Sequence, residues 1–138
     1  MIRAREMRTG GMEKSERWRR VETWLVGLVV LHSLTVGAML LFAPGWSTRF
    51  AGWSGVAPLF FPRQAGVFHF VVSFAYVYEL VRFRGVTILL FTKAAAFLFL
   101  ISAGLFGETA WSVPFSGVAD GLMGLSVGVV HHLARRAG

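Results

Sequence analysis

The sequence predicts an all-α integral membrane protein built as a four-helix bundle, and two observations support this class. The chain of 138 residues is 55% hydrophobic and only 15% charged, which is more apolar surface than a soluble core of this size can bury. The apolar residues also gather in four runs, each long enough at about 1.5 Å per residue to cross a hydrocarbon core of about 30 Å. We therefore expect lipid to surround most of the chain.

The charge of the chain fits a membrane surface better than nucleic acid. The net charge is +7, but the basic residues lie beside the apolar runs and do not form a soluble basic domain. Cysteine is absent, which excludes disulfides, thiolate metal ligands and cysteine nucleophiles. The expected partner is the lipid bilayer, and no nucleic acid is expected.

A basic segment, residues 1–22, precedes the first apolar run. It holds seven Lys or Arg against four Glu. Trp18, Val21 and Leu25 recur at helical spacing, so a short helix lying in the membrane interface is one interpretation. A solvated basic tail is the other.

The first predicted span covers residues 23–42, and His32 is its only ionisable residue. A cleaved secretory signal is the rival interpretation. The run is longer than a signal core of roughly 7 to 15 residues, and no small-x-small cleavage site follows it, so we expect an uncleaved anchor. Residues 43–61 then hold two Pro, three Gly and two Trp, a composition that breaks helices and favours the outer membrane interface.

The second predicted span, residues 62–83, is the most polar of the four. Pro62 suits the first turn of a helix. Polar side chains follow along the span at Arg63, Gln64, His69, Ser73, Tyr76 and Glu79. His69, Ser73 and Tyr76 fall on one helix face, and Glu79 lies one turn further on a neighbouring line. Ionisable groups inside a membrane mark a ligand, proton or ion site by default, so this face is the candidate lining of a polar interior.

The third and fourth spans, residues 86–106 and 114–133, contain one charged residue each, Lys93 and Asp120. A short basic tail, residues 134–138, follows the fourth span. His131 and His132 stand beside its arginines and are expected to be solvated.

Glycines mark one face of the fourth span at intervals of four, three and four residues: Gly117, Gly121, Gly124 and Gly128. This spacing predicts a packing seam that another helix backbone can approach closely. The sequence leaves open whether the partner helix belongs to the same chain or to a second subunit.

Depth along the spans predicts two ion pairs. Glu79 lies about 9 Å before the turn at Gly85 and Lys93 about 12 Å after it, so these two should meet across the hairpin. Arg63 and Asp120 should pair at the opposite side if the fourth helix packs near the second. A lone charge in a membrane helix costs about 3 kcal/mol on insertion scales, so pairing or access to water is expected. Each pair could stabilise the bundle or line a pathway.

Lys and Arg outside the spans set the expected orientation. Eleven lie on the side of the two chain ends and two, Arg49 and Arg63, lie on the other. The excess of positive charge places both termini in the cytoplasm, and an even number of spans agrees with this.

His32 and His69 belong to adjacent antiparallel spans and differ in depth by about 6 Å. Such a pair could ligate haem b through its iron, or anchor a quinone. Hydrogen-bonded core histidines are the preferred interpretation, so no cofactor and no metal site is predicted, and haem b or quinone is the alternative. The chain lacks the zinc-protease, nucleophile-elbow, P-loop and dinucleotide fingerprints, so it is not expected to be an enzyme.

Several segments resemble small bacterial four-helix membrane proteins of the DoxX-like kind. The second span opens FPRQAGVFHF, the third carries a single lysine, and the fourth contains SGVADGLMGL. The resemblance covers residues 23–133 and implies an accessory subunit of a membrane redox system, but it carries over no catalytic residue.

The sequence thus predicts a non-enzymatic accessory or small-ligand-binding subunit of the bacterial cytoplasmic (inner) membrane, in a homo-oligomer or a larger complex. One alternative is a small oligomeric transporter or channel that uses Glu79 and Lys93. A second is a membrane anchor for haem or quinone that uses His32 and His69.

Overall fold

The protein is all-helical in the residues that its structure, a computed structural model, describes, which are 2–107 and 110–137, with side chains from Glu13 onward. These residues form the helices α1 (Ile2–Phe42), α2 (Pro44–Phe50), α3 (Phe60–Phe83), α4 (Thr87–Leu105) and α5 (Ser112–Arg136). Four of them, α1, α3, α4 and α5, are long and apolar enough to cross a membrane.

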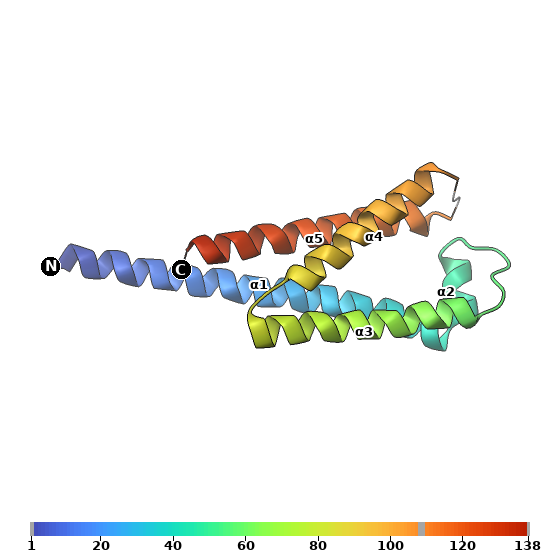
Figure 1. Cartoon of the computed structure of the whole chain (residues 1–138), viewed down its shortest axis with the longest axis horizontal. Coiled ribbons are helices and arrows are strands. Elements are labelled where there is room, and N and C mark those ends of the chain that lie inside the picture. The colour runs from blue at the N-terminus through green and yellow to red at the C-terminus, as the bar shows by residue number, and fades with distance from the viewer. Residues whose placement is uncertain (1, 108–109, 138) are drawn as a thin grey trace.

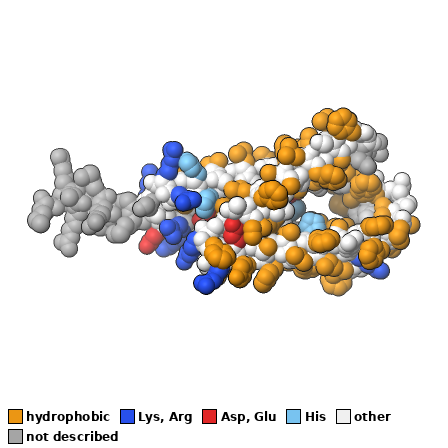
Figure 2. Space-filling view, viewed as in Figure 1, with side chains coloured by type: hydrophobic (Ala, Val, Ile, Leu, Met, Phe, Trp, Pro, Cys, Tyr) orange, Lys and Arg blue, Asp and Glu red, His pale blue; other side chains and the backbone are white. Residues whose placement is uncertain are grey.

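The four long helices run antiparallel in sequence order, and the start of α1 and the end of α5 lie at the same end of the bundle (Figure 1). We call this the terminal end. Helix α1 packs against both α3 and α5, and α4 packs against α5. Helix α4 starts beside α3 at their shared turn but then crosses toward α5, so α3 and α4 make little contact (Figure 1). Lysine and arginine side chains gather at the terminal end, and apolar side chains cover the flanks (Figure 2).

Prolines stand in the first turn of three helices. Pro44 is the first residue of α2, and Pro62 and Pro114 are the third residues of α3 and α5. The first N–H groups of a helix have no acceptor within it, so a proline at one of these positions removes no hydrogen bond of the helix. Both spans therefore begin two residues before the proline at which the sequence predicted their start.

The basic segment is helical, because α1 runs unbroken from Ile2 to Phe42. Its place in the membrane interface or in solvent stays a prediction. The segment after Phe42 differs from the expected helix-breaking stretch, because α2 forms within it. Ser47 and Thr48 donate their hydroxyl hydrogens to the carbonyl oxygen of Pro44, at 3.1 and 2.7 Å. Both hydroxyl groups are therefore hydrogen-bonded within the short helix.

The α2 region is tied to the start of α5. The indole nitrogen of Trp111 donates a hydrogen bond to the carbonyl oxygen of Phe50 at 3.0 Å. The Trp111 ring also packs edge-on against the Phe50 ring, with centroids 5.9 Å apart. These contacts join the α2 region to the α4–α5 connection at the end opposite the termini.

Helices α1 and α3 cross at two glycines that the sequence analysis did not single out. A Cβ atom on Gly66 would lie 2.7 Å from the carbonyl oxygen of Gly37 and 2.9 Å from the backbone nitrogen of Leu41. Both neighbours are backbone atoms, which cannot turn aside as a side chain can. The crossing therefore depends on glycine.

The predicted glycine seam of α5 lies against α4 of the same chain. A Cβ on Gly121 would approach the Phe97 ring to 2.7 Å, and one on Gly124 would approach the Cβ of Lys93 to 3.1 Å. Gly117 and Gly128 face Ile101 and Leu90 in the same way. The seam thus brings α4 close to α5 along most of its length.

All four long helices contribute to one apolar core. Its buried members are Val26, Val29, Tyr76, Val86, Leu89 and Val127. Many other large apolar side chains are exposed, such as Trp24, Phe74 and Phe91. Apolar flanks around a small core are the arrangement that suits a lipid solvent.

Candidate functional site

A buried ion pair joins α4 to α5. The Lys93 Nζ lies 2.5 Å from the Asp120 Oδ1, and their side chains are only 6% and 14% exposed. The glycine seam makes this contact possible, because Gly124, one turn after Asp120, lets the α4 backbone approach. Two opposite charges are thereby held together between two apolar helices.

An imidazole from each of the other two spans lies near this pair. His32 belongs to α1 and His69 to α3. The charges of Lys93 and Asp120 contribute to the electrostatic environment of both imidazoles, and His69 lies against α1, where a Cβ on Gly37 would come within 2.9 Å of the His69 Cβ. Each long helix therefore contributes one ionisable residue to a single group, which we call the interior polar cluster: His32, His69, Lys93 and Asp120.

The bundle is hollowed on one side, near histidine side chains. Figure 2 shows the molecule hollowed between the α1 and α3 pair and the α4 and α5 pair, toward the end that holds α2, with histidine side chains at the inner edge. In agreement, His32 is exposed and His69 is half-buried. An ion pair thus lies near imidazoles that are not fully enclosed.

Ser73 and Tyr76 share the buried face of α3, each only 2% exposed. The Ser73 hydroxyl donates to the carbonyl oxygen of His69 at 2.7 Å, within its own helix. Tyr76 packs in the apolar core. The predicted stripe thus shares one face, but these two residues are packed in the core, and His69 is the member that joins the interior polar cluster.

The predicted pair of Glu79 and Lys93 is wrong. The two Glu79 carboxylate oxygens accept hydrogen bonds from the backbone nitrogens of Thr87 and Ile88, each at 2.8 Å. The residue before α4, Val86, offers no side-chain cap, and the positive end of a helix favours a carboxylate. Glu79 therefore caps α4, whereas Lys93 lies further along a helix that has left α3 for α5.

The predicted pair of Arg63 and Asp120 is also wrong. Arg63 and Gln64 are exposed at the start of α3. Among the described residues the backbones of α3 and α5 do not come close to each other, and α1 packs against both. Asp120 therefore pairs with Lys93 on the neighbouring helix.

The sequence analysis did not predict a further interaction, between a histidine and a glutamate. His131 Nδ1 and Glu22 Oε1 are hydrogen-bonded at the terminal end, so the prediction of a solvated His131 is wrong. His132, the next residue, is exposed as expected. This pair could have been predicted from the sequence, because Glu22 precedes the first span and His131 lies at the end of the fourth. Antiparallel helices bring these two positions to the same end of the bundle.

The described residues contain no group of three or more metal-binding side chains arranged to hold an ion. Comparisons with protein-family models, with curated proteins and with solved structures found no match. The DoxX-like resemblance and the roles it implies therefore stay predictions.

We expect Glu79→Ala to lower the free energy of unfolding by about 1 to 3 kcal/mol, because two N–H groups at the start of α4 lose their acceptor. Glu79→Gln keeps one acceptor oxygen and should lose less. Glu16→Ala is the control, since the Glu16 side chain is 73% exposed. Denaturant titration in detergent micelles measures all three. A Glu79→Ala protein as stable as the parent would show that the carboxylate does not cap α4.

Proposed function

We propose that the protein is a non-enzymatic accessory membrane subunit that binds a small ligand inside its helix bundle, at the interior polar cluster. The observation that carries this proposal is the buried Lys93–Asp120 pair, whose charges act on an imidazole from each remaining span. Ionisable residues within membrane helices are costly, and where they occur they commonly serve a ligand, a proton or an ion.

A purely structural ion pair would explain Lys93 and Asp120 but not the two histidines. The His32 side chain is exposed, and the charges of Lys93 and Asp120 act on its imidazole. It is therefore available to a ligand. A neutral imidazole offers one hydrogen-bond donor and one acceptor. A molecule that enters from the hollowed side would meet these groups first, with the charges of the pair near them.

A quinone is the ligand class that this arrangement favours. A quinone ring is apolar, which suits a bundle in lipid, and its carbonyl oxygens can accept hydrogen bonds from imidazole N–H groups. Haem b held by His32 and His69 is the second candidate, because both histidines belong to one cluster. Either ligand would fit an accessory role in a membrane redox system, which the DoxX-like resemblance implies.

Extraction of the purified protein tests the proposal. We expect a small molecule to copurify with the parent protein and with the control His132→Phe, and to be reduced at least about tenfold in His32→Phe with His69→Phe. Absorption and mass spectra of the extract identify the molecule, since a Soret band indicates haem and a quinone has its own ultraviolet spectrum. Thermal unfolding checks that the variant remains folded.

An empty parent protein would overturn the ligand-binding proposal. If that protein also conducted protons or ions in liposomes, the interior polar cluster would serve a transport pathway instead. Such a pathway would use Lys93 with Asp120, because Glu79 caps α4.

We also propose that the chain resides in a bacterial inner membrane with both termini in the cytoplasm, because basic residues concentrate at the terminal end. The chain has no native cysteine, so single cysteines report topology directly. Ser54→Cys should react with an impermeant thiol reagent in intact cells, and Arg136→Cys should react only after permeabilisation. Ser54 is a better position than the nearby Gly52, because Gly52 has φ +92° and a Cβ there would meet Trp111. The opposite labelling pattern would reverse the orientation.

A further inference from the structure

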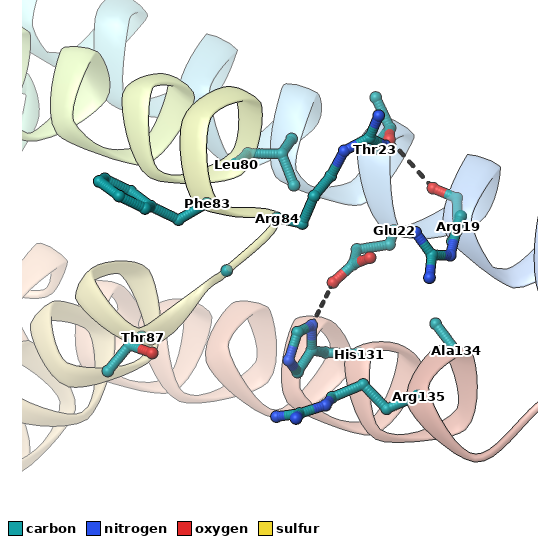
Figure 3. Close-up of a pocket in the computed structure, with 11 residues that line it drawn as sticks. Arg19, Glu22, Thr23, Leu80, Phe83, Arg84, Thr87, His131, Ala134 and Arg135 are labelled. Carbon is teal, nitrogen blue, oxygen red and sulfur yellow. Dashed lines mark hydrogen bonds and ion pairs between the residues drawn. The ribbon is translucent and has the colours of Figure 1, made fainter. Parts of the chain in front are cut away.

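A cavity of about 350 Å³ opens at the terminal end of the bundle, apart from the interior polar cluster. Three arginines from three parts of the chain line it: Arg19 of α1, Arg84 of the α3–α4 turn and Arg135 of α5. Figure 3 shows the side chains of Arg19, Glu22 and His131 in the space between α1 and α5, with Arg84 entering from the turn. Two helices and a turn therefore bring basic groups to the lining of this cavity.

The charge of the cavity is positive. Glu22 is the only carboxylate in its lining, and it is already hydrogen-bonded to His131. In the part of the chain whose side chains are described, none of the three guanidinium groups lies within 4.0 Å of a carboxylate oxygen. A guanidinium group presents a planar set of donors that matches the oxygens of a phosphate. An anion with several oxygens is the ligand that this lining suits.

The position of the cavity selects among such anions. Leu80 and Phe83 supply apolar surface in the same lining. Trp24, one turn from Arg20 on α1, is 76% exposed, and exposed tryptophans are typical of the membrane interface. The basic side chains of the chain gather at this end (Figure 2). A ligand with a phosphate group and an apolar tail would contact both the basic and the apolar residues of the lining, at the depth of the lipid headgroups.

We propose that this cavity binds the phosphate of an anionic phospholipid, with the guanidinium groups of Arg19 and Arg135 as its main donors. The Glu22–His131 pair positions α1 and α5, which carry these two arginines. Anionic membranes attract basic segments even where the protein has no lipid site. The test must therefore distinguish a specific lipid-binding site from this non-specific electrostatic attraction.

Two double variants of equal charge make that separation. Arg19→Gln with Arg135→Gln removes two cavity arginines, and Arg20→Gln with Arg136→Gln removes two neighbours that do not line the cavity. Arg84 is left in place, because it ends α3 in the left-handed conformation with φ 54°. Both variants change exposed side chains only, and thermal unfolding verifies that each is folded.

Native mass spectrometry in a neutral detergent measures binding during titration with dioleoylphosphatidylglycerol, dioleoylphosphatidylcholine or inorganic phosphate. We expect one phosphatidylglycerol to bind the parent protein more tightly than phosphatidylcholine. The cavity variant should lose affinity for it roughly tenfold, and the neighbour variant should lose less than about threefold.

Three results would overturn the proposal. Equal losses in both variants would show that general surface charge accounts for binding. Equal affinity for the two lipids would remove the anionic selectivity. Inorganic phosphate that displaces phosphatidylglycerol at equal concentration would assign the cavity to a free anion rather than to a lipid.

Discussion

Lys93→Met should lower the free energy of unfolding by about 3 to 5 kcal/mol, as expected when one partner of a buried ion pair is removed. The substitution leaves the Asp120 carboxylate, which is only 14% exposed, without its countercharge between two apolar helices. Asp120→Leu should be comparably damaging, because it leaves the Lys93 ammonium group unpaired. The double variant should lose less than either single one, since no charge then remains.

A surface pair of the same chain serves as the matched control. Arg20 and Glu16 stand 4.0 Å apart with side chains 81% and 73% exposed. Because water and salt screen such a pair, Arg20→Met should change stability by less than about 1 kcal/mol. Denaturant titration in micelles compares the unfolding free energies of Lys93→Met and Arg20→Met directly. A Lys93→Met protein as stable as Arg20→Met would show that the interior charge is well hydrated.

The second large effect is expected at the crossing of α1 and α3. Gly66→Ala should destabilise the protein by about 1 to 3 kcal/mol, and Gly66→Leu by more, because the added atoms would meet the backbone of Gly37 and Leu41. Gly27→Ala is the control on α1, since nothing lies within 4 Å of the position of its Cβ. Alanine also favours a helix over glycine, so Gly27→Ala should be neutral or stabilising.

The predicted seam of α5 provides a graded comparison. Gly121→Ala meets the ring of Phe97, which is 37% exposed and has room to turn. It should therefore be less damaging than Gly66→Ala, whose neighbours are backbone atoms. Thermal unfolding of the two variants in one detergent gives the order, and a larger loss at Gly121 would show that α4 and α5 form the tighter contact.

The four long helices could be predicted from the sequence because span length and apolar content are local properties. Pro62 and Pro114 also fixed two of the helix starts to within two residues, since a proline is tolerated only in the first turn. The glycine spacing of α5 identified a packing face for the same local reason.

The ion pairs could not be predicted in this way, because residue counting gives depth along a helix but not its neighbour. Lys93 has similar depth to Glu79, yet α4 leaves α3 after their turn and brings Lys93 to Asp120. The role of Glu79 left a readable signal. Val86 is a poor cap for α4, and a carboxylate on the far side of the Gly85 turn is well placed to replace it.

A pair of double-mutant cycles tests the central claim, that Lys93 is the partner of Asp120 inside the bundle. One cycle combines Lys93→Met with Asp120→Leu, and the other combines Lys93→Met with Glu79→Gln, with unfolding free energies measured in the same micelles. The structure predicts a coupling energy of about 2 to 3 kcal/mol for Lys93 with Asp120 and less than about 0.5 kcal/mol for Lys93 with Glu79. A coupling to Glu79 that equals or exceeds the coupling to Asp120 would contradict the arrangement of the interior polar cluster.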